Sequence, residues 1–585
     1  MNPEPSSQPG LPSWTKDGRL LLGLLLIAVM AASWPGMKAP LLLDDLDSLR
    51  HAQQQTSLSQ SLQPDCYGLF RPIKSAFYYL LRDSLAVSSF GAHLFGLSAF
   101  LIATVTVYFL TLTLFKSRTW AAAASAFWAL APTQASTILW LSCANISIGI
   151  ALFCAALLFH IRHTSATAGL SVFSLLAATC LFLAQSCYES MIAGLGIIIA
   201  ADFLRKGTIS FKRLMPSYGC YFAITVGFLL LRHLQGAATA YSNGNPAISP
   251  DTGALQLVLS SPWFLKQHLF MWLLPLGRIE FLGSYIWGKS AGPLDLAWAA
   301  FIVASLATLA ITLRTRLPWS SFGIAWFLCA SFPSSNLIPI YAGPIEDYYL
   351  AFPSIGLAIM AADLARAAWK SGRQSESTPS RTRALMILSL SIISLRLGFA
   401  LLLPFQASAW STHGTYLARS SATRPYQFIN DGLLARELYL AGDIREAHEL
   451  AAATSKIAPW YALPASVEAG SLVQMGRDLE ALGAYKRAIQ SPSDFTPIAQ
   501  SAMVESAAIH IRETKDWSSA RALLIPVLEH GFPEFRKKGI HVMADLYLEQ
   551  DLPGKAIGTI EKGIQIFPDD PSFSKRLKDL ETGRN

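Results

Sequence analysis

Residues 18–50 read GRLLLGLLLIAVMAASWPGMKAPLLLDDLDSLR, and this stretch decides how the rest of the chain is interpreted. A long apolar run is followed, where it ends, by three carboxylates, Asp44, Asp45 and Asp47. The hydrocarbon core of a bilayer needs about 20 apolar residues per helix. The stretch therefore predicts a membrane-spanning helix over 18–36 and places the acids just beyond the membrane.

The composition divides the chain into two parts. Of its 585 residues, 52% are hydrophobic and 14% are charged, whereas soluble domains carry about 25% charge. Apolar stretches of spanning length fill residues 20–404, and none follows. We therefore predict an all-α protein with a cytoplasmic tail over 1–17, a polytopic membrane bundle over 18–404 with external loops at 37–88 and 235–292, and a soluble domain over 405–585.

The pattern predicts about eleven spans, over 18–36, 89–115, 119–141, 144–160, 167–186, 190–204, 216–234, 293–313, 320–340, 347–365 and 384–404. Basic residues gather in alternate connections, at Lys16, Arg19, Lys116, Arg118, Arg162, Arg205, Lys206, Lys212, Arg213, Arg314, Arg316, Arg366, Lys370, Arg373, Arg381 and Arg383. The net charge of +8 thus indicates membrane topology and not a nucleic-acid partner, because cytoplasmic loops are enriched in Lys and Arg. Eleven spans place the C-terminal domain outside; without 190–204 it would lie in the cytoplasm. A cleaved signal peptide is the alternative for the first run.

With this topology, acids from three separate segments meet the same external face. Asp44, Asp45 and Asp47 lie in the first loop, Glu189 in the turn QSCYES, and Glu346 and Asp347 in the turn YAGPIEDYYLAFPS. Acids near a membrane interior are costly and are usually functional. The alternative is that they solvate loops or cap helices, since aspartate is a good N-cap.

The first loop also predicts an amphipathic helix. In CYGLFRPIKSAFYYLLRDS, residues 66–84, apolar side chains recur at helical spacing with Arg71 and Lys74 between them. Such a helix lies on a membrane surface, with its basic residues at the depth of lipid phosphates. Arg71 and Lys74 are then phosphate ligands, or they snorkel without a specific ligand.

Residues 426–568 show an internal period. Turn residues recur at Gly442, Gly476, Asp516 and Asp551, an alanine early in each second helix at Ala447, Ala481, Ala520 and Ala556, and prolines at Pro459, Pro492 and Pro568. Spacings of about 34–40 residues, each a helix–turn–helix, are typical of tetratricopeptide-like repeats. Such helix pairs stack into a solenoid that binds protein or serves as a packing platform.

The ordered motifs resemble the GT-C class of membrane glycosyltransferases. The resemblance is carried by LLLDDLDSL (41–49), LFRPIKS (69–75), GAHLFGLSAF (91–100), LAPTQASTILWLSCANISIGIALF (130–153), CYESMIAGLGIIIAADFL (187–204), WFLKQHLFMWLLPLGRIEF (263–281) and FPSSNLIPIYAGPIEDYYLAFPSIG (332–356). It is closest to the branch with C-terminal tetratricopeptide repeats, the transmembrane-and-TPR O-mannosyltransferases and their bacterial relatives. The sequence departs from that family at three positions. Ala131 replaces a histidine, Tyr188 a lysine and Asp347 an arginine, so the sugar is not assigned by analogy.

The resemblance implies transfer of a sugar from a polyprenyl-phosphate carrier to an acceptor hydroxyl on the external face, with inversion. Asp44 is the predicted base or acceptor ligand and Asp45 its partner, because a paired carboxylate takes the proton or tunes its neighbour. Candidates for binding the donor phosphate are Arg71, Lys74, Arg232, His233, Lys266 and His268. Candidates for orienting acceptor or sugar are Asp47, His93, Glu189, Glu346 and Asp347. Whether a divalent cation, Mg²⁺ or Mn²⁺, takes part stays open.

The expected partners are a polyprenyl-phosphate sugar, the lipid bilayer, and a protein acceptor such as a pilin or a surface glycan. The short loops and compact repeats favour a bacterial inner membrane, with the N-terminus cytoplasmic and the repeats periplasmic. Two other functions compete with this interpretation. An O-antigen ligase or polymerase would not need Asp44, and a non-catalytic scaffold for the repeats would need none of the acids.

Overall fold

The computed structural model describes residues 18–42, 44–166, 170–206, 211–236, 247–276, 283–337, 343–374, 379–423, 426–491 and 497–582. These residues are all-α, apart from one isolated bridge between Trp287 and Ala291. The chain forms two compact units, residues 1–242 with 252–423, and residues 243–251 with 424–585. The predicted tail over 1–17 lies outside the described residues.

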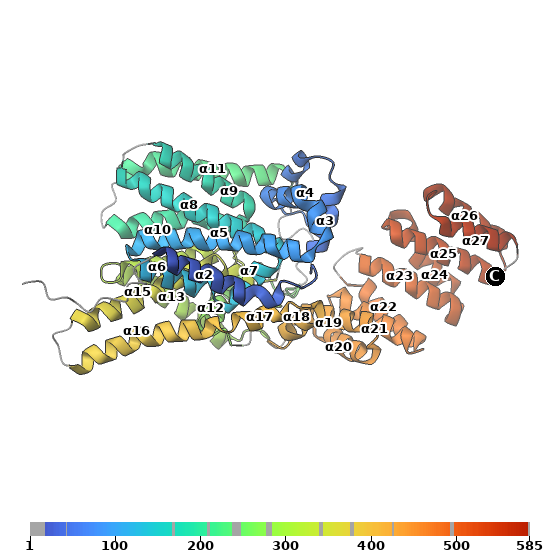
Figure 1. Cartoon of the computed structure of the whole chain (residues 1–585). Coiled ribbons are helices and arrows are strands. Elements are labelled where there is room, and N and C mark those ends of the chain that lie inside the picture. The colour runs from blue at the N-terminus through green and yellow to red at the C-terminus, as the bar shows by residue number, and fades with distance from the viewer. Residues whose placement is uncertain are drawn as a thin grey trace, which may run out of the picture. The chain divides into compact units, whose positions relative to one another are not determined.

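The first unit is a bundle of long helices lying side by side (Figure 1). Its members include α2 (Gly18–Ser33), α5 (Ser89–Phe115), α6 (Arg118–Ala129), α8 (Ala144–Ala166), α9 (Val172–Cys187), α10 (Gly194–Lys206), α11 (Phe211–Leu234), α12 (Ala254–Leu273), α13 (Pro293–Thr312), α14 (Pro318–Ser331), α15 (Pro353–Gln374) and α16 (Pro379–Ala400). Helix α8 packs between α5 and α9, and α14 packs along α15. The last pair crosses at Gly323 and Gly356, where a Cβ on either residue would strike the backbone of the other. Small residues permit this close approach between membrane helices.

Five segments among the described residues are long and apolar enough to cross a membrane: Gly18–Gly36, Ser89–Phe115, Leu141–Thr164, Pro293–Thr312 and Thr382–Ala409. They coincide with five of the predicted spans, so these apolar helices are confirmed. Two of the other predicted spans, 216–234 and 347–365, fall on the long helices α11 and α15. The rest are shorter or interrupted helices. The span predicted over 119–141 ends as α6 at Ala129 and continues in short turns, because Pro132 cannot supply the backbone N–H of a continuing helix. The predicted loop 235–292 contains the 20-residue helix α12.

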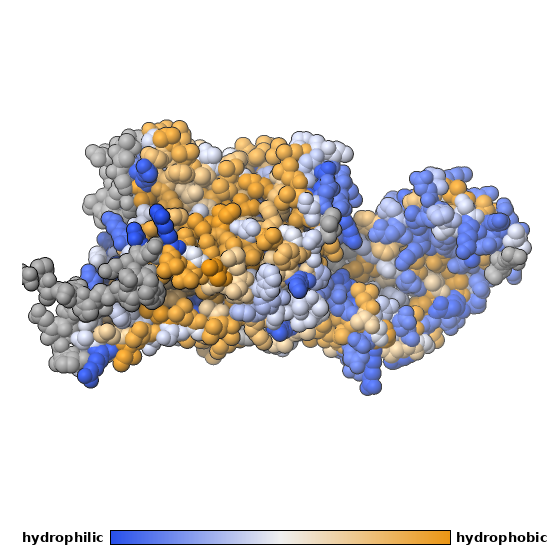
Figure 2. Space-filling model, in the orientation of Figure 1, coloured by the Kyte–Doolittle hydropathy of each residue, from blue (hydrophilic) through white to orange (hydrophobic). Residues whose placement is uncertain are grey.

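The flank of the bundle is apolar. Figure 2 shows hydrophobic residues covering the side of the first unit, with polar residues towards its ends. Helix α13 is an example, since only 6% of its most apolar stretch is buried and Leu294 is 86% exposed. Water solvates such a surface poorly, whereas lipid tails match it. The surface therefore agrees with the predicted contact with a bilayer.

The second unit is an array of antiparallel helix pairs. The helices are α19 (Phe428–Ala441), α20 (Ile444–Ile457), α21 (Ala462–Gln474), α22 (Asp478–Ile489), α23 (Pro497–Ile509), α24 (Trp517–His530), α25 (Pro533–Glu549), α26 (Pro553–Ile566) and α27 (Pro571–Glu581), and each packs against the next. The predicted alanines, Ala447, Ala481, Ala520 and Ala556, are all completely buried. The turn glycines Gly442 and Gly476 have φ of +89° and +73°, a conformation that glycine adopts without strain. The helix–turn–helix repeats are confirmed within the described residues; Pro492 lies outside them.

The predicted domain boundary differs from the division into units. Two short helices, α17 (Leu403–Ala409) and α18 (His413–Ser421), follow α16 and belong to the first unit. Helix α17 packs against α2 and the short turns near it. The compact division therefore falls after residue 423, whereas the sequence places it at 404, where the last apolar span ends.

Candidate functional site

The first predicted external loop is an ordered cap at one end of the bundle (Figure 1). It consists of α3 (Asp45–Gln54), the 3-10 turn η2 (Leu58–Leu62) and α4 (Pro72–Val87). Asp44 is the N-cap residue of α3, and Pro72 begins α4 at the position where helices tolerate proline. The cap packs on α5 and on the start of α8. This packing brings the acids of α3 and the basic residues of α4 together.

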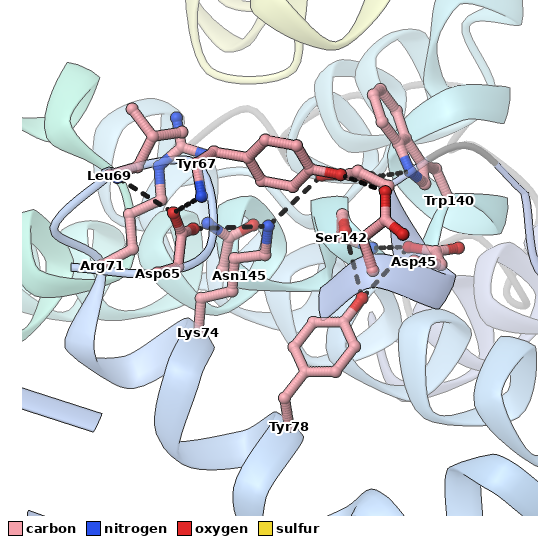
Figure 3. A network of polar contacts seen from close by, with 12 residues as sticks. Asp45, Asp65, Tyr67, Leu69, Arg71, Lys74, Tyr78, Trp140, Ser142 and Asn145 are labelled. Carbon is pink, nitrogen blue, oxygen red and sulfur yellow. Dashed lines mark hydrogen bonds and ion pairs between the residues drawn. The ribbon is translucent and has the colours of Figure 1, made fainter. Parts of the chain in front are cut away.

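Asp45 is a buried carboxylate. Its side chain is 1% exposed, and its Oδ1 accepts hydrogen bonds from Tyr78 Oη at 3.1 Å and from the Ser142 backbone N–H at 2.8 Å (Figure 3). Burial and the neighbouring charge of Asp44 raise the pKa of Asp45 from 3.8 to about 7. Its Oδ2 has no hydrogen-bond partner among the described residues. A carboxyl with this pKa titrates near neutral pH.

Asp44 is the more accessible acid of the pair, since its side chain is 26% exposed. Its Oδ1 accepts a hydrogen bond from Trp140 Nε1 at 2.8 Å, and its Oδ2 lies 3.5 Å from Lys74 Nζ. Lys74 is buried and also lies 4.0 Å from Asp65 Oδ2. The indole and the ammonium therefore fix Asp44 while leaving part of the carboxylate open to a ligand.

Arg71 and Glu189 join the cap to the rest of the bundle. The Nε and Nη2 of Arg71 each donate a 2.7 Å hydrogen bond to the carboxylate of Glu189. Burial raises the pKa of Glu189, but the Arg71 guanidinium outweighs it and lowers that pKa to about 2. The guanidinium also lies 4.9 Å from the ring of Tyr188, which replaces the lysine of the resembled family. A second cation at that position would repel Arg71.

The structure changes the expectation for the two cations of α4. From the sequence, Arg71 and Lys74 are predicted to be phosphate ligands or snorkelling residues on a membrane-surface helix. Helix α4 is present, but Lys74 is 2% exposed and both cations are engaged by carboxylates. The carboxylates lie far away in the sequence, so periodicity within the helix did not reveal the pairing.

The acids of the late turn lie in the neighbourhood of the cap. Glu346 and Asp347 sit at the start of η6 (Asp347–Leu350) and are both buried. The ring of Tyr348 packs against Trp140 at 5.3 Å between centroids, and Tyr349 packs against His268 of α12 at 6.0 Å. The charge of Glu346 acts on Cys143, as do the charges of Asp44 and Asp45. The late turn therefore adjoins the acidic pair and brings His268 towards it; Lys266 lies two residues before His268 on α12.

The other residues predicted for the site differ in how they relate to this network. His93 Nε2 lies 3.0 Å from the Ala39 carbonyl oxygen, which fixes the segment just before the acids. Asp47 is exposed and accepts a hydrogen bond from Tyr67 Oη. Arg232 contributes to the lowered pKa of Glu189, whereas His233 is exposed at the end of α11 and makes no contact with this network in the described part of the chain.

Sequence reasoning missed several members of the network, namely Asp65, Tyr67, Tyr78, Trp140 and Ser142 (Figure 3). One of them had a local signal. Asp65 Oδ1 accepts hydrogen bonds from the backbone N–H groups of Tyr67 and Leu69, the pattern of an Asx-turn ahead of Gly68. The others are aromatic or small residues whose roles depend on long-range packing.

A metal ion is not favoured by this arrangement of side chains. Within the described ranges, no group of three or more His, Cys, Asp or Glu side chains is placed to hold a metal. Lys74 already lies beside Asp44 and Asp65, where a cation bound between them would be placed.

No family model and no curated protein matches the chain. One solved structure, titled "Crystal structure of APC/C hetero-tetramer Cut9-Hcn1", aligns with 86% of this chain and 92% of that chain. The sequence identity is 13% and the TM-score is 0.25. A TM-score this low does not establish a common fold, so the repeats are described from their own helix packing alone.

Proposed function

We propose that the chain is an integral-membrane glycosyltransferase of the GT-C type, which moves a sugar from a polyprenyl-phosphate donor to an acceptor hydroxyl. The observation that supports the proposal is the pairing of a partly exposed carboxylate, Asp44, with a buried one, Asp45, at the end of an apolar bundle. The pair lies where a lipid-borne donor and a water-borne acceptor would meet. Its surroundings contain the cations that a phosphate leaving group requires.

The two carboxylates have different roles in this proposal. Asp44 is the base or the acceptor ligand, because part of its carboxylate is open while Trp140 holds its orientation. Asp45 is enclosed by Tyr78 and Ser142, so it acts by repelling and positioning its neighbour. The acceptor oxygen attacks the anomeric carbon as the sugar–phosphate bond breaks, and the proton passes to Asp44. Direct attack inverts the configuration at the anomeric carbon.

The phosphate subsite is proposed on the side of α11 and α12. Arg71 and Lys74 are engaged by their carboxylates, and the residues proposed to contact the leaving phosphate are Arg232, Lys266 and His268. The aromatic residues of η6, next to His268, form a wall against which a sugar ring would pack. This assignment reduces the set of residues predicted to bind the donor phosphate and does not identify the sugar.

The proposed topology retains about eleven membrane crossings, a bacterial inner membrane and the repeats in the periplasm. The apolar flank supports insertion into a bilayer. The helix pairs of the second unit are proposed to bind a protein acceptor, a pilin being one example, since such arrays commonly bind polypeptide. A surface glycan is the other acceptor class.

The proposal is tested with Asp44→Asn and Asp45→Asn in the full chain. Membranes from cells that express wild type or variant at matched levels are assayed for sugar-sized mass shifts on extracytoplasmic proteins and glycans. We expect Asp44→Asn to lower transfer by roughly 100-fold or more, because a positioned base contributes about 10²–10⁴-fold. Asp45→Asn should lower transfer less, since it removes no proton acceptor.

The matched control is Asp83→Asn. Asp83 belongs to the same cap, but its side chain is 92% exposed, and transfer should stay at the wild-type rate. Full activity of Asp44→Asn would contradict the proposal and favour an O-antigen ligase or polymerase. If no acid of the network is needed for the cellular function, the chain is a scaffold for its repeats.

A further inference from the structure

A small polar pocket lies between α3 and α4, behind the acidic pair. Its walls include Ser48, His51 and Gln55 from α3 and its C-cap, and Lys74, Ser75 and Tyr78 from α4. The three neutral polar residues, Ser48, Gln55 and Ser75, are 6%, 8% and 7% exposed. Ser48 Oγ, Gln55 Oε1 and Ser75 Oγ have no hydrogen-bond partner among the described residues. Buried polar atoms in native proteins are almost always satisfied, so these atoms indicate a ligand.

The ammonium of Lys74 leads to the same conclusion. An ammonium has three N–H donors. Within the described ranges, Lys74 makes one hydrogen bond, to Asp44 at 3.5 Å. Its second carboxylate neighbour, Asp65 Oδ2, is 4.0 Å away and is itself a buried acceptor without a hydrogen bond. An ammonium with a 3% exposed side chain needs further acceptors within reach.

The chemistry of the pocket selects water as its occupant. The lining offers donors and acceptors together, with an ammonium that disfavours a metal cation. Buried water typically makes about three hydrogen bonds to polar groups that are otherwise unsatisfied. The lining supplies four such groups, Lys74 Nζ, Asp65 Oδ2 and the hydroxyls of Ser48 and Ser75, which is enough for a water molecule.

The pocket adjoins both carboxylates through single residues. Lys74 lines the pocket and pairs with Asp44. Tyr78 also lines the pocket, and its hydroxyl donates to Asp45 (Figure 3). His51, which is only half-buried, lines the same pocket. A connection therefore leads from the acidic pair, through the pocket, to a partly solvent-accessible imidazole.

We propose that ordered water in this pocket carries the proton released during sugar transfer from Asp44, through Lys74, to His51 and then to bulk solvent. The inference rests on the proposed function, in which the acceptor covers the open side of Asp44 during reaction. The proton from the acceptor hydroxyl binds Asp44 as the new glycosidic bond forms and the lipid phosphate departs with the bonding electrons. Asp44 passes a proton to Lys74 as Lys74 donates one to water, and His51 accepts it and releases it outside.

The deciding experiment compares His51→Gln with Arg50→Gln in the full chain in lipid nanodiscs. Arg50 is the matched control, since it neighbours His51 on α3 but is 72% exposed and does not line the pocket. In dilute buffer at constant pH, we expect His51→Gln to lower the transfer rate roughly 10-fold, below the full effect of a general base. Imidazole added to the buffer should restore the rate, because a small base entering from solvent replaces the missing ring. A merely structural role for His51 would not respond to imidazole.

A second variant, Ala52→Leu, fills the pocket. Ala52 lines the pocket and is 1% exposed, so leucine displaces the water, and its loss of rate should resist imidazole. Transfer by His51→Gln at the wild-type rate in dilute buffer would overturn the proton route, even when Asp44→Asn is inactive. If wild type transfers no sugar, the proposed function fails by itself, and the pocket is judged by a high-resolution structure of the full chain. Continuous water density between Lys74 Nζ and Ser48 Oγ supports hydration, and a dry pocket rejects it.

Discussion

The first unit contains two buried polar networks, and they differ in how completely their hydrogen bonds are satisfied. The network of the cap joins Asp44, Asp45 and Lys74 and leaves several buried atoms without partners in the described part of the chain. The second network surrounds His160 at the other end of α8. Its two ring nitrogens contact Tyr221 Oη at 3.1 Å and Asp202 Oδ2 at 2.7 Å.

The second network continues outward through paired groups. Tyr218 Oη donates to Asp202 Oδ2 at 2.8 Å, and the two ring nitrogens of His163 lie near Ser171 Oγ and Ser217 Oγ. About 16 residues of α8, or roughly 24 Å of helix, separate His160 from the start of the helix near Ser142. A buried network in which most polar groups are paired, as around His160, specifies packing, whereas one that leaves several buried atoms without hydrogen bonds marks a place where a ligand or water belongs. The difference assigns structure to one end of α8 and chemistry to the other.

The largest effect is expected from Asp202→Ala. The substitution leaves His160 and Tyr218 buried without their shared acceptor, and removal of one partner of a buried pair costs about 3–5 kcal/mol. The unfolding midpoint in detergent should fall steeply, while the transfer rate per folded molecule should stay unchanged. Asp44→Asn should show the reverse, with a lost rate and a nearly wild-type midpoint. If Asp202→Ala lowered the rate of the folded fraction, the separation of the two networks would be wrong.

Much of the fold could be predicted from the sequence. The span over 89–115 coincides with α5, because its apolar residues continue without proline between two polar ends. The repeats followed from glycines and alanines whose local roles are fixed by helix geometry. Interrupted segments were harder, since hydropathy over 119–141 is continuous while Pro132 ends the helical hydrogen bonding.

The candidate site could be predicted only in part. The acids and cations could be identified from the sequence because charged residues near an apolar segment are unusual. Their pairing was not, since Arg71 and Glu189 are separated by 118 positions. Trp140 and Tyr78 act through single polar atoms on large apolar rings, and nothing in their local sequence distinguishes them from core aromatics.

The next largest effect is a pair of opposite pH dependences within the cap. Between pH 3.8 and about 7, Asp45 binds more protons in the folded state than in the unfolded state. Its contribution to the free energy of unfolding therefore decreases as the pH rises through that window, by up to about 4 kcal/mol. Glu189 has a lowered pKa of about 2, against 4.5 when unpaired. Its stabilising contribution is present above pH 4.5 and is lost as the pH falls, by up to about 3 kcal/mol.

The measurement is the difference in unfolding free energy between wild type and variant as a function of pH. Relative to wild type, Asp45→Asn should gain stability as the pH rises from 4 to 7, and Glu189→Gln should gain as it falls from 4.5 to 3. The two slopes have opposite signs because burial and Asp44 dominate one carboxylate, whereas Arg71 dominates the other. Slopes of the same sign would refute this electrostatic description of the cap.

The smallest effect compares two buried serines, one in each network. Ser217 Oγ lies 3.0 Å from His163 Nε2, so Ser217→Ala leaves a buried ring nitrogen without that contact and should cost about 1–3 kcal/mol. Ser48 Oγ has no partner among the described residues, so Ser48→Ala removes a hydroxyl whose desolvation is not offset by protein. The stability of Ser48→Ala should stay within about 0.5 kcal/mol of wild type. Equal losses would mean that both networks are structural, and the distinction between the two ends of α8 would no longer hold.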